Sequence, residues 1–190
     1  LLPEIALTTQ LINRIQDKFG KQVLVYHSKY SANERVEIYK KVLHNNSPQV
    51  IVGTRSAIFL PFNRLKFIIV DEAHAVGVCG SDYKGLTYAF SSEIFARIIT
   101  CGKALGSHGA FVLGSEELKL FLVNFSRPLI YSTGATPVHL QSVLASLIYF
   151  DQDQASKTTL QEVIGYFRQQ LDHLGLRPKF LASETAIQSY

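Results

Sequence analysis

Residues 67–78 read FIIVDEAHAVGV, and this stretch decides the fold. Four apolar residues run directly into two carboxylates, Asp71 and Glu72, and His74 follows two positions later. A short apolar run bounded by polar residues is typical of a strand buried in a parallel sheet. Ligands of such sheets bind at the carboxyl ends of the strands. Asp71, Glu72 and His74 are therefore candidate functional residues.

Short apolar strands alternate with amphipathic helices on both sides of this stretch. We predict strands at residues 23–26, 50–53, 67–70, 98–100 and 110–113, and helices at 8–19, 31–43, 115–125, 138–150 and from 158 or 159 to about 174. The helix at 138–150 is mostly apolar, so we expect it to be buried, whereas residues 151–159 are polar and predict a linker. The alternation predicts an α/β fold, a three-layer α/β/α arrangement with a mostly parallel sheet.

Composition excludes several classes of protein. Hydrophobic residues make up 47% of the 190 residues and charged residues 18%, as expected of a globular domain. The sequence has no apolar run of roughly 18 residues, so we expect no membrane span. Cys79 and Cys101 form neither a disulfide framework nor a metal-ligand spacing. Without a secretion signal, we expect a cytoplasmic protein with reduced thiols. Because the chain contains no methionine, we also expect a piece of a longer protein.

Charge is unevenly distributed along the chain. Residues 1–70 carry ten Lys and Arg against four Asp and Glu, a net +6, whereas residues 71–190 carry nine against eleven, a net −2. A basic segment can bind phosphate backbones, so DNA is a candidate partner of the first part. A solvated basic surface without a partner would have the same composition.

Residues 1–72 resemble the primosomal replication-restart helicases, which are DNA-dependent ATPases. The strings LLPEIALTTQ, YHSKYSANER and VIVGTRSAIFLPFNRLKFIIVDE carry this resemblance, and GTRSAIFLPF is the most specific of them. The resemblance implies that ATP and Mg²⁺ are cofactors, with Asp71 holding the metal and Glu72 orienting the attacking water. It also implies DNA contacts at residues 3–4 and at Thr54, Arg55 and Ser56.

One part of that chemistry has no counterpart in the sequence. ATP hydrolysis requires a glycine-rich loop ending in Lys-Ser or Lys-Thr to hold the phosphates, and this chain contains no such loop. We therefore expect Asp71 and Glu72 to form the end of a strand that holds no nucleotide.

From Asp71 onward the chain resembles 8-amino-7-oxononanoate synthases. These enzymes use pyridoxal 5'-phosphate to join an amino acid to an acyl-CoA with loss of CO₂. The strings DEAHAVGVCG, ARIITCGKALGSHGAFVLGSEELKLFLVNFSRPLIYSTGATPVH and GYFRQQLDHLGL carry the resemblance. It implies that Lys103 forms a Schiff base with the cofactor and that Asp71 pairs with the pyridine nitrogen. It further implies that His74 bonds the ring hydroxyl oxygen and that Thr100 holds the phosphate.

Two further residues enter through the same resemblance. Ser132 and Thr133, in the string YSTG, match a segment that reaches the phosphate across a dimer interface, so a homodimer is implied. The sequence departs from the family at Cys79, at Cys101 and in GATP. It also contains no counterpart of the histidine that stacks on the cofactor ring in the family.

The two resemblances meet within the string VDEAH, which suggests a recombined, engineered or misassembled chain. We expect residues 1–70 to be an incomplete helicase-like segment, 71–150 part of a pyridoxal-phosphate domain, and 151–190 a linker with the start of a truncated C-terminal domain. The leading prediction is a synthase-type acyltransferase fragment that is inactive alone, with Lys103 and His74 as its catalytic residues. The alternatives are a DNA-binding or ATPase fragment and a hybrid without either function.

Overall fold

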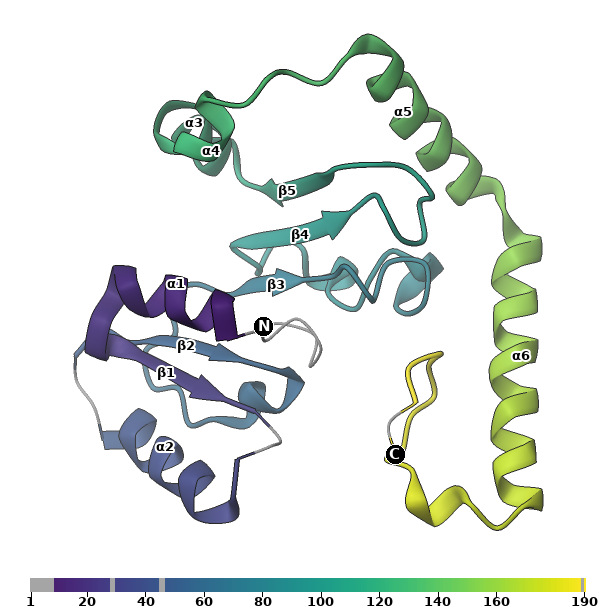
Figure 1. Ribbon diagram of the computed structural model, residues 1–190, viewed down its shortest axis with the longest axis horizontal. Coiled ribbons are helices and arrows are strands. Elements are labelled where there is room, and N and C mark those ends of the chain that lie inside the picture. The colour runs from purple at the N-terminus through teal and green to yellow at the C-terminus, as the bar shows by residue number, and fades with distance from the viewer. Residues whose placement is uncertain (1–8, 28–29, 45–46, 189) are drawn as a thin grey trace.

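The computed structural model describes residues 9–27, 30–44, 47–188 and 190, and of Arg55 only the backbone. Two small sheets organise these residues, with β1 and β2 in one sheet and β3, β4 and β5 in the other (Figure 1). The α/β class predicted from the sequence is confirmed, although the strands are divided between two sheets. Among the described residues, no helix combines the length and apolar character needed to cross a membrane.

The first sheet lies between two helices. Strands β1 (Val23–Tyr26) and β2 (Val50–Gly53) have the predicted bounds and pair in parallel. Side chains of α1 (Thr9–Phe19) pack with Val23, Val25 and Val52 on one face. The alternate residues of the strands pack with Ile38 and Val42 of α2 (Ala32–His44) on the other face. This alternation follows from the period of two in a strand, and it produces three layers.

The second sheet contains the candidate site. Strand β3 (Ile69–Asp71) pairs in parallel with β4 (Ala96–Thr100), which pairs antiparallel with β5 (Ala110–Gly114). Cys101, Leu105 and Val143 form the adjacent hydrophobic cluster, together with the half-buried side chains of Ile99, Phe111 and Phe150. This cluster connects the loop after β4 to the long helix α5 (Pro137–Gln152).

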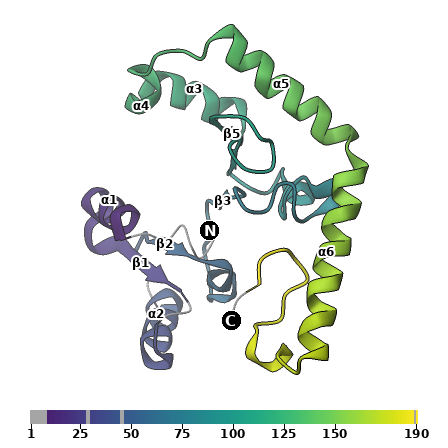
Figure 2. The same cartoon turned by 45° about the vertical axis from the view of Figure 1, so that its right-hand side comes forward.

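The remaining helices extend from the second sheet. Helix α3 (Glu116–Phe125) is preceded by Ser115, whose hydroxyl accepts a bond from the Leu118 amide, as expected of an N-cap. The short α4 (Arg127–Ile130) follows, and α5 and α6 (Gln154–His173) then run along the outside of the molecule (Figures 1 and 2).

Two predictions about this region are wrong. Within α5, all of which is described, only Val143 is buried, whereas Val138 is 80% exposed. Its apolar composition therefore does not correspond to a covered helix. Residues 151–159 are also not a linker, because α5 continues to Gln152 and α6 begins at Gln154. Asp153 joins the two helices, since its carboxylate accepts a bond from the Ser156 amide at 2.9 Å.

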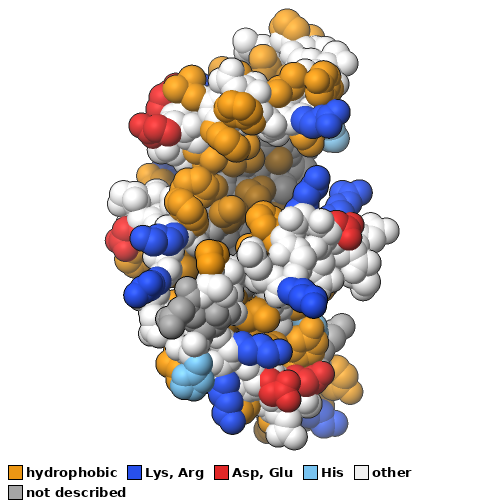
Figure 3. All heavy atoms as spheres, turned by 90° about the vertical axis from the view of Figure 1, so that its left-hand side faces the viewer, with side chains coloured by type: hydrophobic (Ala, Val, Ile, Leu, Met, Phe, Trp, Pro, Cys, Tyr) orange, Lys and Arg blue, Asp and Glu red, His pale blue; other side chains and the backbone are white. Residues whose placement is uncertain are grey.

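Apolar side chains are also exposed elsewhere on the surface. Figure 3 shows hydrophobic side chains gathered over the upper half of one face and several Lys and Arg side chains over the lower half. On α3, Leu120, Phe121, Val123 and Phe125 are each more than half exposed. Monomeric proteins seldom leave so many large apolar groups in water.

Candidate active site

Two strand ends bring predicted site residues to one edge of the second sheet. Asp71 is the last residue of β3 and Thr100 the last of β4, and the two strands run in the same direction. Asp71 pairs with Ile98, so the two share a face, and Thr100 lies on that face because it is two residues after Ile98. The sheet therefore places both side chains on the same face at its carboxyl edge.

The loops that follow these strands bring together the lysine and the histidine. The Lys103 ammonium lies 2.8 Å from Nε2 of His74, although the two residues are 29 positions apart. The backbone turn that carries His74 begins at Asp71, whose carboxylate accepts the Ala73 amide at 2.9 Å. Lys103 is exposed, so its amine is accessible to a ligand.

Thr100 provides a test of whether the edge suits a phosphorylated cofactor. Among the described residues, its hydroxyl oxygen is the only buried side-chain polar atom without a hydrogen-bond partner. A buried hydroxyl normally finds a partner, so an orphaned one suggests a ligand site. A cofactor phosphate would accept a bond from it, and Lys103 supplies the amine that an aldehyde cofactor requires. The residues at this edge therefore fit pyridoxal 5'-phosphate.

Cys101 lies between Thr100 and the lysine loop but does not join the site. Its side chain is 1% exposed and packs against Leu105 and Val143. Burial raises the pKa of the Cys101 thiol, because an apolar environment disfavours the thiolate. The cysteine at this departure from the family pattern is therefore a packing residue.

Ser132 and Thr133 are not brought to this edge. They follow α4, and α3 and α4 lie beyond the carboxyl end of the antiparallel strand β5, at the opposite end of the sheet (Figure 1). The Ser132 hydroxyl donates to the Leu129 carbonyl at 2.9 Å. Within one chain these two residues are therefore separate from Lys103.

Of the residues predicted for DNA binding, Thr54 and Ser56 contact each other. Thr54 is 2% exposed, and its hydroxyl lies 3.2 Å from that of Ser56. Arg55 begins the 3-10 turn Arg55–Phe59, and the prediction for its side chain falls outside what the structure describes. Residues 3–4 likewise lie outside the described residues.

Glu72 is not available for the role predicted by the helicase resemblance. It is 1% exposed, and its Oε1 lies 3.3 Å from Nη2 of Arg97 in a buried ion pair. The Leu86 amide donates to Oε2 at 3.0 Å, and the Thr87 amide donates to Oε1 at 2.8 Å. The carboxylate is therefore buried and bonded to protein donors at both oxygens, and it does not face solvent. Among the described residues, no three His, Cys, Asp or Glu side chains are grouped to hold a metal ion.

Sequence reasoning missed Arg97, which is the partner of Glu72. The signal was present, because a charged residue stands between apolar residues in the strand ARIIT. Buried charges are rare unless they are paired, so a partner carboxylate was to be expected. That this partner is Glu72 could be found only from the pairing of β3 with β4.

Two family models match this chain. The aminotransferase class I and II model matches residues 64–190, and the DEAD/DEAH box helicase model matches residues 1–97. Each match covers more than half of the chain. The chain belongs to both families. The two matched ranges overlap at residues 64–97, which include the DEAH string and the buried pair.

Individual relatives divide in the same way. Replication restart protein PriA of Bacillus subtilis is 47% identical over 74 residues, which is 39% of this chain and 9% of PriA. The 8-amino-7-oxononanoate synthase of Xanthomonas campestris is 37% identical over 122 residues, which is 63% of this chain and 30% of the synthase. The synthase of Cellvibrio japonicus is 39% identical over 114 residues, covering 58% of this chain and 29% of that protein.

A solved structure supports the fold of this helicase–aminotransferase chain. The 8-amino-7-oxononanoate synthase of Francisella tularensis superimposes with a TM-score of 0.57 at 21% identity, covering 78% of this chain and 53% of that chain. The likeness establishes the fold. The matched regions cover about a third or less of the length of the three curated relatives described above.

Proposed function

We propose that the chain carries the lysine-bearing part of a pyridoxal-phosphate-dependent acyltransferase of the oxononanoate-synthase type. Its reaction would join an amino acid to an acyl-CoA with loss of CO₂. In this proposal, residues 71–150 are part of the cofactor domain and residues 151–190 begin the C-terminal domain. Residues 1–70 are an incomplete helicase segment.

The contact between Lys103 and His74 carries the proposal. Two polar side chains 29 positions apart meet at 2.8 Å at the edge where Asp71 and Thr100 end their strands. When bound, the cofactor supplies an electron sink for the amino-acid carbanion. Lys103 would hold the cofactor covalently, and His74 would orient its ring through the hydroxyl oxygen.

The other two residues would hold opposite ends of the cofactor. Asp71 would keep the ring nitrogen protonated, because a carboxylate at that atom favours the charged form. The Thr100 hydroxyl would donate to the phosphate and so gain the partner that it lacks. A second copy of the chain would be required to bring Ser132 and Thr133 to the phosphate.

We expect weak cofactor binding and no turnover from this chain alone. The chain spans 30% of the Xanthomonas synthase, so the other 70% of that protein lies outside the matched region. We also propose a homodimer, as the synthase resemblance implies, and a cytoplasmic location.

The test is covalent capture of the cofactor on one lysine. The protein is mixed with pyridoxal 5'-phosphate and reduced with borohydride, and the labelled peptide is located by mass spectrometry. We expect the label on Lys103 and its loss in Lys103→Ala. Lys119→Ala is the matched control, because Lys119 is an exposed lysine on α3 whose ammonium bonds the Glu116 carboxylate. Equal labelling of Lys103→Ala and the parent would refute the proposal.

DNA binding by the first part is the second candidate function, with an ATPase as its extension. The match to PriA and the net charge of +6 over residues 1–70 favour it. It predicts salt-sensitive binding to DNA that is weakened by Arg55→Ala. Arg127→Ala, in the other part, is the control. Binding that is unchanged in Arg55→Ala at low salt would reject this role of Arg55.

A hybrid without either function is the third alternative. It predicts that Lys103 is labelled no faster than Lys119 and that DNA does not bind at low salt. Both experiments together therefore distinguish the three alternatives.

A further inference from the structure

The second carboxylate of the DEAH string faces away from the proposed cofactor. Side chains alternate along β3, so Glu72 lies on the face opposite to Asp71. Arg97 pairs with Val70 in the register of β3 and β4, and so it lies on the same face as Glu72. Asp71 and Thr100 thus occupy one face of the edge, and the Glu72–Arg97 ion pair occupies the other.

We propose that the Glu72–Arg97 pair is a positioning device for the cofactor edge. Neither side chain would touch the cofactor, and both would act through Asp71, His74 and Thr100. The proposal rests on the proposed function and adds to it the residues that hold the geometry of the edge. It also gives Glu72 a role other than the water-orienting role expected of a helicase.

The first support is that Glu72 is held through both its side chain and its backbone. Its amide donates to the Ile98 carbonyl at 2.8 Å, which extends the β3–β4 ladder. Its carbonyl accepts the amides of Ala75 and Val76 at 2.9 and 3.1 Å, which closes the turn that carries His74. Rotation of Glu72 would therefore move both Asp71 before it and His74 after it.

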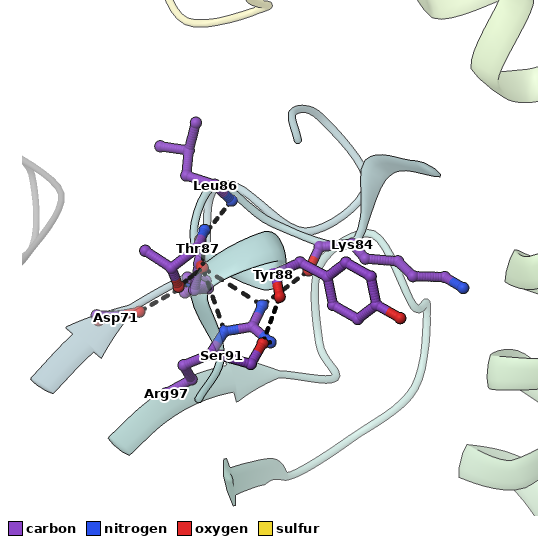
Figure 4. Close-up of polar contacts among 9 residues, drawn as sticks. Asp71, Lys84, Leu86, Thr87, Tyr88, Ser91 and Arg97 are labelled. Atoms are coloured by element: carbon purple, nitrogen blue, oxygen red, sulfur yellow. Dashed lines mark hydrogen bonds and ion pairs between the residues drawn. The ribbon is translucent and has the colours of Figure 1, made fainter. Parts of the chain in front are cut away.

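The second support is the loop that covers the pair. Besides Glu72, Arg97 donates to the Lys84 carbonyl at 2.8 Å and to the Ser91 hydroxyl at 3.3 Å (Figure 4). Residues 80–85 contain four left-handed φ angles, at Gly80, Asp82, Tyr83 and Gly85. Backbone in this region persists only where its surroundings hold it, and it is often found near functional sites.

The third support is energetic. A buried ion pair contributes little net stability, because desolvation offsets the attraction, and an apolar pair of similar size is often as stable. We therefore expect Glu72 and Arg97 to fix the geometry of the strand ends rather than to raise the free energy of unfolding. Arg97 lies three residues before Thr100 on the same short strand, so its anchoring also holds the strand end that carries the Thr100 hydroxyl.

The deciding variant is the double substitution Glu72→Gln with Arg97→Met. Either single change leaves a buried charge or an unpaired group and can unfold the protein. In the double variant no charge remains, the glutamine oxygen still accepts an amide of the loop, and methionine fills the aliphatic space. Glu116→Gln with Lys119→Met is the matched control, because that pair is exposed and lies 2.9 Å apart on α3.

Two measurements are made on each protein. The first is borohydride-trapped pyridoxal 5'-phosphate on Lys103, and the second is hydrogen exchange of the Ala73 and Cys101 amides without cofactor. We expect the folded double variant to trap at least about tenfold less cofactor and to exchange these two amides at least about tenfold faster, while α6 exchanges as in the parent. The control is expected to match the parent in both.

Parental trapping by the folded double variant would overturn the proposal. So would faster exchange that extends equally to α6, because this would indicate a general stabilising role. If the parent itself traps no cofactor on Lys103, the proposed function fails, and the exchange measurement alone decides the positioning role. Parental exchange at Ala73 and Cys101 would then reject it.

Discussion

Gly85 lies against the buried ion pair, and Gly85→Ala should destabilise the protein by about 3 kcal/mol or more. Its φ of 102° costs a residue with a side chain about 1–3 kcal/mol. A Cβ at this position would lie 2.9 Å from Nη2 of Arg97 and 3.0 Å from Oε1 of Glu72, so one of them must move. Weakening a bond to a charged group costs about 1.5–3 kcal/mol more.

Thermal unfolding followed by circular dichroism measures this effect. For a chain of this size each kcal/mol lowers the midpoint by about 2–4 °C, so we expect a decrease of at least about 6 °C. Gly165→Ala is the control, because Gly165 lies within α6 with nothing within 4 Å of an added Cβ. Gly165→Ala should raise the free energy of unfolding by up to about 1 kcal/mol. A Gly85→Ala midpoint within about 2 °C of the parent would refute the close packing of Gly85 against the Glu72–Arg97 pair.

Three further predictions concern other regions. Hydrogen bonds from Ser31 lower the pKa of Glu34, so they stabilise the folded protein at pH values above the ordinary pKa of 4.5. This stabilisation is lost as the pH falls through the lowered pKa. The difference in urea midpoint between the parent and Ser31→Ala should therefore shrink in acid. A difference that stays constant with pH would contradict the stabilising role of the Ser31–Glu34 bonds. Burial raises the pKa of the Cys101 thiol, so Cys101 should react with a thiol reagent at least about tenfold slower in the native protein than in urea. Val143→Ala should cost about 2 kcal/mol and the exposed Val138→Ala under about 0.5 kcal/mol, and equal unfolding midpoints would reject the packing of α5.

The local elements could be predicted from the sequence where a short-range pattern determines them. The bounds of β1 and β2 were predicted correctly, and the Ser31 capping box forms as its spacing indicates, with the Ser31 amide 2.8 Å from the Glu34 carboxylate. Strand periodicity and capping depend on residues a few positions apart, so the sequence alone contains the information.

Prediction failed where the outcome depended on what surrounds an element. The composition of α5 indicated burial, yet most of its apolar side chains are exposed. Burial depends on the presence of a partner surface, which the composition of a helix cannot reveal. The polar residues 151–159 indicated a linker, but Asp153 caps α6 and makes them helical.

The DEAH string separates what the sequence determined from what the tertiary structure decided. The sequence by itself identified Asp71, His74, Thr100 and Lys103 as one set and presented Glu72 as a candidate for a second chemistry. Only the pairing of β3 with β4 placed Arg97 against Glu72 and removed that carboxylate from solvent. The reason is physical, because the two charges are 25 positions apart in the chain and meet only when the strands align.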